Sequence, residues 1–190
     1  MKKKQIKLSL FSIIIFSLLF SSMQFLVPVD GLADEFIPRT PCRIADSRTY
    51  LAPHSQGDYR GPFTVGTTIC YKSDGGGAFD IGPQGGNTSG CYSWWPVPWD
   101  GDPTGIHVNV TAIPVSGRGH LRLYPADLIM PNASILSWDV KVGNISNAVS
   151  AAVYDEWTGD LQKEFCIYIG GYWGSQVNIA MDIMGYYYEP

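Results

Sequence analysis

Hydrophobic and polar positions alternate along most of the chain beyond residue 33, a pattern typical of β-strands with one buried face. Residues 106–112 show it most clearly, because His107, Asn109 and Thr111 separate apolar side chains. No long run repeats every 3.6 residues, so the pattern predicts no helix in this part of the chain. Comparable runs occupy residues 63–69, 121–124, 135–140, 148–154, 165–169 and 176–183.

Glycine, proline and asparagine gather between these runs, as expected for tight turns. Short strands at such spacing predict an all-β fold, either a β-sandwich or a jelly-roll-like barrel. We expect residues 34–190 to form a single domain of this class. Because residues 148–154 are almost entirely apolar, we expect them to form a central strand.

An irregular insertion at about residues 73–105 interrupts the alternation and is rich in glycine and proline. It is too long for an ordinary connection, which indicates either a functional loop or an ordered insertion. Its aromatic rings could stack on sugars while nearby carboxylates bond hydroxyl groups, so we expect a ligand site there. The alternative is that the rings pack as a plug over one end of the domain. The candidate binding residues are Tyr92, Trp94, Trp95, Trp99, Asp100 and Asp102.

The first 33 residues have the features of a secretory signal peptide. Four lysines precede an apolar stretch over residues 8–27, and Gly31-Leu32-Ala33 offers small residues before a cut at Asp34. The stretch is also long enough to act as an uncleaved anchor, which would be the only membrane attachment. Either way, the sequence predicts that the remaining chain lies outside the cytoplasm, extracellular or at the cell surface.

Composition and cysteine usage narrow the possible chemistry. The chain has a formal net charge of −4, and loss of the signal would make it three charges more negative. An acidic domain is a poor binder of nucleic acid, so we expect no nucleic-acid partner.

An even number of cysteines in an exported chain predicts two disulfides, with three possible pairings. We expect no metal and no cofactor, because neither cysteines nor histidines have ligand spacing. The cysteines are Cys42, Cys70, Cys91 and Cys166.

Three charged residues are candidates for a cluster between the first and last strands. Asp46 and Arg48 are two positions apart and would share one face of a strand, and Asp182 lies on the last predicted strand. We expect this cluster to fix strand register through an arginine–carboxylate pair. The alternative is an acid pair that serves catalysis or binds a metal.

The order of several motifs resembles a family of secreted bacterial domains. These domains carry a PCRxxDTR opening, an NVT strand, a GxLxxYP strand, an SNA segment and a DxxGY close. The resemblance implies export and a β fold, gives no established activity, and favours the pairing Cys42–Cys91 with Cys70–Cys166. Ser47 replaces the usual threonine, and the family usually has a plain connection instead of the tryptophan-bearing insertion. The matching segments here are residues 40–48, 108–111, 119–125, 131 with 134–136, 146–148 and 177–186.

These features favour a secreted or cell-surface, non-catalytic binding domain whose partner is a glycan or a surface protein. No nucleophile elbow, metalloprotease motif or phosphate loop is present, which disfavours an enzyme. Two alternatives stay open: an extracellular hydrolase that uses Asp46 or Asp182, and a structural envelope or matrix protein. The oligomeric state is not determined by these patterns.

Overall fold

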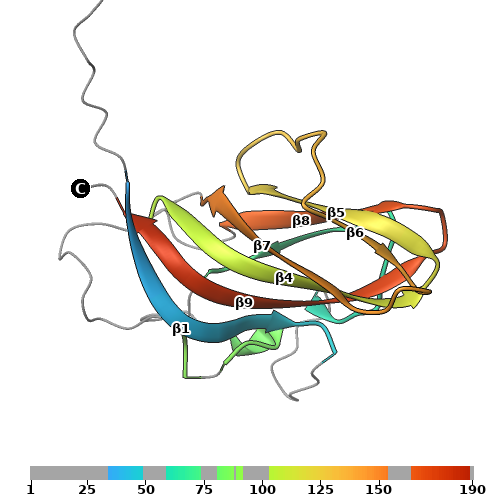
Figure 1. The fold of residues 1–190 in the computed structure, drawn as a ribbon, viewed down its shortest axis with the longest axis horizontal. Helices are drawn as coiled ribbons and strands as arrows, with labels where there is room; N and C mark the ends of the chain where they lie inside the picture. The colour runs from blue at the N-terminus through green and yellow to red at the C-terminus, as the bar shows by residue number, and fades with distance from the viewer. Residues whose placement is uncertain are drawn as a thin grey trace, which may run out of the picture. The chain divides into compact units, whose positions relative to one another are not determined.

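The computed structural model describes residues 34–48, 59–73, 81–87, 89–91, 103–153 and 164–188. The predicted signal segment, residues 1–33, lies outside them. Nine strands and one short 3-10 helix, η3 (Gly82–Gln84), make up the regular structure of this part of the chain (Figure 1). The strands are β1 (Glu35–Asp46), β2 (Phe63–Thr64), β3 (Thr68–Tyr71), β4 (Gly105–Ser116), β5 (Arg118–Pro125), β6 (Leu136–Asp139), β7 (Ile145–Ala152), β8 (Phe165–Gly171) and β9 (Gln176–Tyr188).

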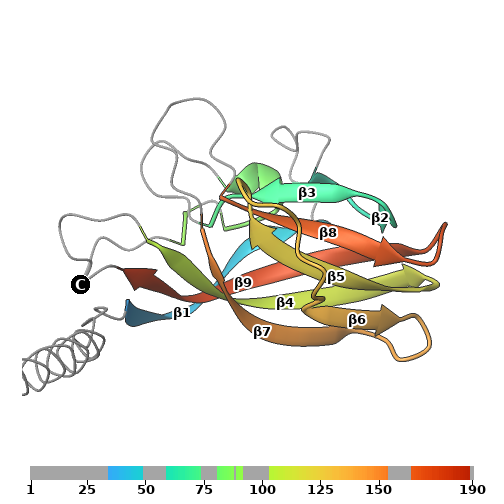
Figure 2. The ribbon, with the colours of Figure 1, turned by 90° about the horizontal axis from the view of Figure 1, so that it is seen from above.

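The strands form two antiparallel sheets packed face to face (Figure 2). The five-stranded sheet has the order β1-β9-β4-β7, with β2 pairing beside β1 on β9, and the four-stranded sheet has the order β3-β8-β5-β6. The all-β prediction is confirmed. Each sheet keeps two edges, so the fold is the β-sandwich of the two predicted alternatives and not a closed barrel.

The core lies between the sheets and is built from alternate strand positions. On β4, Ile106, Val108 and Val110 are fully buried, while His107 and Asn109 between them remain partly exposed on the outer face. Burying a side chain of this size stabilises the fold by about 1.5–3 kcal/mol, so this alternation holds the sheets together. The other fully buried aliphatic side chains include Val177, Ile179, Met181 and Ile183 of β9 and Leu121, Ile167 and Ile169 of the four-stranded sheet.

Strand β1 is not predicted by the hydrophobic pattern. It runs antiparallel to β9, with register shifts between Pro38 and Cys42 and between Arg43 and Ala45. Proline has no N–H to donate and is confined to sheet edges, bulges and strand starts. The two prolines of β1 therefore obscure its strand pattern and at the same time suit its position at the edge.

The run at residues 63–69 is two strands instead of one. Gly66 has a φ of 97°, which glycine adopts readily, and it turns the chain between β2 and β3. Phe63 pairs with Val177 of β9 in one sheet, whereas Ile69 pairs with Ile167 of β8 in the other. The prediction of a single strand is wrong because the chain crosses between the layers here.

The expectation that residues 148–154 form a central strand is also wrong. Strand β7 ends at Ala152 and lies at the border of the five-stranded sheet, paired with β4 alone. Its side chains are mostly small and exposed, with the pattern ISNAVSAA. The apolar character of this run therefore reflects small side chains at an edge, not burial on two faces.

Two disulfides join segments that are distant in sequence. Cys42 of β1 is bonded to Cys91, and Cys70 of β3 is bonded to Cys166 of β8, the pairing that the family resemblance favours. Each cysteine pair thus links one strand to another part of the fold. Disulfides persist in oxidising compartments, so they indicate an environment of the extracellular type.

No helix within the described ranges is long and apolar enough to cross a membrane.

Each disulfide should contribute measurably to stability. We expect Cys70→Ala with Cys166→Ala to lower the free energy of unfolding by about 2–5 kcal/mol. Its sequence separation of 96 is about twice the 49 of Cys42–Cys91, so its loss should cost about 0.6 kcal/mol more than loss of the other. Urea unfolding under non-reducing conditions, with peptide mapping of the bonds, measures both effects. Unchanged stability or a different pairing would contradict the expectation.

Candidate functional site

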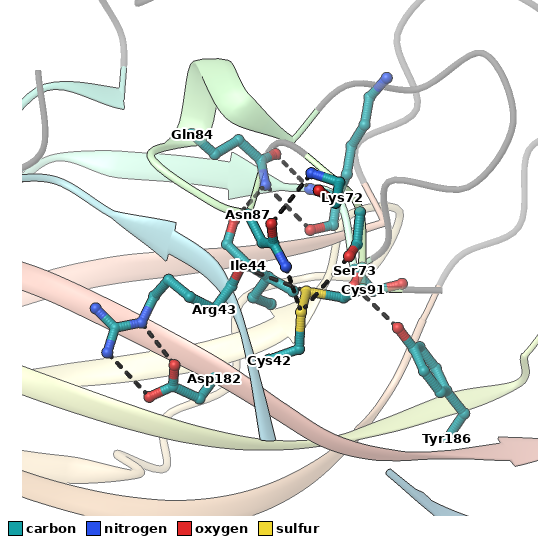
Figure 3. Close-up of a disulfide and its surroundings, with 12 residues drawn as sticks. Cys42, Arg43, Ile44, Lys72, Ser73, Gln84, Asn87, Cys91, Asp182 and Tyr186 are labelled. Atoms are coloured by element: carbon teal, nitrogen blue, oxygen red, sulfur yellow. Dashed lines mark hydrogen bonds and ion pairs between the residues drawn. A yellow bond between two sulfur atoms is a disulfide. The ribbon is translucent and has the colours of Figure 1, made fainter. Parts of the chain in front are cut away.

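Two aspartates and two arginines form one hydrogen-bonded ion cluster beside β1. Arg43 donates from Nε and Nη2 to the two carboxylate oxygens of Asp182, at 2.6 and 3.2 Å (Figure 3). Its Nη1 also donates to Oδ2 of Asp46 at 2.6 Å. Arg48 binds Asp46 as well, from Nε to Oδ1 at 2.9 Å and from Nη2 to Oδ2 at 2.7 Å. The Arg43–Asp182 pair joins the first strand to the last, where the two residues lie opposite each other.

Asp46 is the buried member of the cluster. Its side chain is 4% exposed, whereas those of Arg43 and Arg48 are 38% and 48% exposed. Burial by itself would raise the pKa of Asp46, but hydrogen bonds from Arg48 and the charges of both arginines outweigh burial and lower it. The hydrogen bond to Asp182 raises the pKa of Arg43. A general acid or base needs a pKa near the working pH, so Asp46 is suited to fixing structure.

The sequence-based prediction of this cluster needs two corrections. Arg48 lies in the turn after β1, not on the strand. Its backbone N–H donates to Asp46 Oδ1 at 3.0 Å, and this bond holds Arg48 close to Asp46. Asp46 and Asp182 are connected by Arg43, which the prediction missed. The available signal was the spacing of three between Arg43 and Asp46 within the PCR motif.

The predicted aromatic site, Tyr92, Trp94, Trp95, Trp99, Asp100 and Asp102, lies outside the described residues and stays a prediction. The residues that flank it are described. Cys91 is bonded to Cys42, and Thr104 donates its N–H to the Tyr187 carbonyl at 2.8 Å. The Thr104 hydroxyl donates to Asp34 Oδ2 at 2.6 Å. The insertion is therefore attached to β1 at one side and to the end of β9 at the other.

Residues 81–87 and 89–91 of the insertion are described, and a buried amide fastens them to β1 and to Lys72, directly after β3. Gln84, 2% exposed, accepts the Lys72 N–H at 2.7 Å and donates to the carbonyls of Ile44 and Lys72, both at 3.2 Å (Figure 3). Gly86 passes so close that an added Cβ would lie 2.5 Å from the Ile44 carbonyl oxygen. Asn87 donates its N–H to the Arg43 carbonyl at 2.8 Å. These contacts set the position of Cys91 relative to the ion cluster.

An aromatic pair that the sequence analysis missed lies on the hairpin between β8 and β9. The side chains of Trp173 and Tyr172 are 91% and 63% exposed. Gly174, with a φ of 79°, and the bond from the Ser175 N–H to the Tyr172 carbonyl (3.0 Å) form the turn. The Arg118 guanidinium stacks on the Tyr172 ring, 4.3 Å from its centroid. The signal was the sequence Gly171-Tyr172-Trp173-Gly174, which places two large rings between glycines.

Three hairpin turns bring further apolar side chains to the same end of the sandwich. Val140 donates its N–H to the Gly117 carbonyl at 2.9 Å, and Tyr172 donates to the Arg118 carbonyl at 3.2 Å, so the turns are hydrogen-bonded together. Five of the eight large hydrophobic side chains that are exposed among the described residues lie here. We call this surface the apolar tip: Val115, Arg118, Val140, Val142, Tyr172 and Trp173. Such a concentration of exposed apolar side chains makes the apolar tip a candidate interaction site.

A serine and a histidine meet on the outer face of the five-stranded sheet. Ser150 Oγ lies 3.0 Å from His107 Nδ1 and 2.8 Å from the Tyr187 hydroxyl. His107 and Ser150 lie directly opposite on β4 and β7, so a cross-strand hydrogen bond accounts for the contact. Within the described ranges no carboxylate binds His107, and a serine nucleophile needs a base oriented by a third group.

In the described part of the chain, no group of three or more histidine, cysteine, aspartate or glutamate side chains could hold a metal ion. No family model matches the chain, and neither curated proteins nor solved structures give a significant match. The resemblance to the secreted bacterial domains therefore rests on the order of the motifs and stays a prediction.

The lowered pKa of Asp46 predicts an acid-dependent contribution to stability. Because the folded pKa lies below the ordinary value of about 3.9, the contribution is complete above that value and disappears as the pH falls through the folded pKa. We expect Asp46→Asn to lose less stability than the wild type between about pH 5 and pH 2. Denaturant unfolding across this range measures the slopes, with Asp127→Asn, an exposed aspartate, as the control. Equal slopes in wild type and Asp46→Asn would contradict the expectation.

Proposed function

We propose that the chain is an exported, non-catalytic domain that binds an extended polysaccharide outside the cell through its apolar tip. The observation that carries the proposal is Trp173, whose ring is 91% exposed on a hairpin of defined geometry. The two disulfides support an oxidising location. The hydrogen bonds that both arginines donate to Asp46 support a structural role for the ion cluster.

The tip has the composition of a binding surface. Trp, Tyr and Arg are the side chains that contribute most binding energy at protein interfaces, and Trp173, Tyr172 and Arg118 lie together here. The backbone bonds of the turn and the Arg118–Tyr172 contact already order these groups. Less entropy is therefore lost when a ligand binds.

The shape and charge of the tip favour a neutral polymer. The Trp173 ring is almost fully exposed on a turn, and such a ring suits the C–H faces of a chain of sugar rings better than it suits an enclosed small molecule. Arg118, whose guanidinium lies over the Tyr172 ring, supplies hydrogen-bond donors beside the rings. The net charge of the chain is −4, so it would repel a polyanionic ligand.

Replacement of the exposed tryptophan should separate binding from folding. We expect Trp173→Ala to weaken retention on insoluble neutral polysaccharides or glycan arrays by about 10–100-fold, the effect of losing one aromatic anchor. The melting temperature should hardly change, because the ring is almost fully exposed. Ile129→Ala is the matched control, since Ile129 is 95% exposed but lies on the connection between β5 and β6.

Equal retention of Trp173→Ala and wild type would refute the proposal. Binding to intact cell surfaces that requires Trp173 but survives enzymatic removal of polysaccharide would replace the glycan by a surface protein. Hydrolysis of the polymer by the wild type would favour the hydrolase instead.

A further inference from the structure

Among the described residues, only β4 pairs with strand β7, and the other edge of β7 lacks the usual protection against pairing. Its eight residues, ISNAVSAA, include no charge and no proline, and Ser146, Ala148, Ser150 and Ala152 are exposed. An edge strand exposes unpaired backbone N–H and C=O groups that another strand can bind. Natural antiparallel proteins therefore protect their edges with short strands, charges or prolines.

The other three edges of the sandwich are protected in these ways. Strand β1 contains Pro38 and Pro41 and four charged residues. Strand β3 has four residues, and so has β6, which ends in Asp139. In Figure 2, β7 forms the outer border of its sheet. Of the four edges, β7 is therefore the one best suited to pair with another strand.

The direction of the free backbone groups follows from the pairing with β4. Val153 donates its N–H to the Thr104 carbonyl at 3.1 Å, and Ala152 lies opposite Gly105. Because backbone groups alternate in direction along a strand, the odd-numbered residues of β7 bond to β4. The groups of Ser146, Ala148, Ser150 and Ala152 point away from it, and no described residue pairs with them.

The side chains beside this edge leave room for another strand. Ser146 and Ser150 are held on their own sheet, by Thr111 at 2.7 Å and by His107 at 3.0 Å. Ala148 and Ala152 are the remaining outward side chains and are small. Val149 faces the core side and is only partly buried, so a neighbouring strand would cover it further.

We propose that β7 pairs antiparallel with β7 of a second copy of this chain, around a two-fold axis near Val149. The residues whose backbone groups point away from β4 then pair with the same residues of the second copy. Ala148 lies opposite Ser150 of the second copy, and Ser146 lies opposite Ala152. An uncharged edge allows two net-acidic copies to meet without like charges at the contact, whereas it offers a charged partner strand no counter-charge. The contact is isologous, so it closes after two copies and builds no fibre.

The experiment measures mass against concentration for the exported chain, by sedimentation or light scattering between about 1 and 100 μM. We expect a dimer that dissociates on dilution. Ala148→Lys should weaken dimerisation by at least about tenfold, because two lysines would meet near the axis. Ser137→Lys is the matched control: it adds the same charge at an exposed position on the β6 edge and should dimerise normally.

A second variant tests the backbone pairing itself. Ala148→Pro removes an N–H that points away from β4, so it should abolish dimerisation while the monomer keeps its strand content by circular dichroism. Hydrogen exchange should show concentration-dependent protection at residues 146, 148, 150 and 152, and none at the odd positions, which β4 already protects. A monomeric wild type at 100 μM, or an Ala148→Lys variant that dimerises like the wild type, would overturn the proposal.

Discussion

The pairing of the first strand with the last is the contact on which the five-stranded sheet depends. Strand β9 bonds to β1 and β2 on one side and to β4 on the other, so β1 reaches this sheet only through β9. A slip of one residue would turn the core side chains of β9 to the solvent. The paired charges of Arg43 and Asp182 oppose such a slip because they meet in only one register. Asp46, buried beside them, extends this constraint into the following turn.

The two ends of the sandwich differ in chemistry. At one end, the hairpins of β4–β5, β6–β7 and β8–β9 are hydrogen-bonded together and expose valines, a tyrosine and a tryptophan. Towards the other end, the described flanks of the irregular insertion are fastened by a disulfide, by Gln84 and by Thr104. A rigid scaffold with loops concentrated at its ends is the usual way in which β-sandwiches present binding residues.

Pairing of two β7 strands would determine how the apolar tips of two copies are arranged. Because β7 begins next to the apolar tip and the pairing is antiparallel, a two-fold axis near Val149 places the two tips at opposite ends of a continuous sheet. Such a dimer would bind two separate ligand molecules, one at each tip, instead of binding a single surface through both tips. A bridging role also accommodates the matrix-protein alternative, since a protein that cross-links polymers is both a binding and a structural component.

The sequence by itself determined the all-β class and the buried faces of strands such as β4 and β9, because alternation and turn chemistry are local properties. It did not determine which runs are central or at an edge: residues 148–154 and 63–69 were misjudged, and the prolines of β1 hid most of the strand that precedes Asp46. The spacing between Arg43 and Asp46 and the glycines around Trp173 are local signals, but they do not show which distant groups these two side chains meet. Only the tertiary structure places Arg43 between two aspartates 3 and 139 positions away. Only the hydrogen bonds between hairpins gather Trp173, Arg118 and three valines on one surface, because strand order and layer crossing depend on contacts between residues distant in the chain.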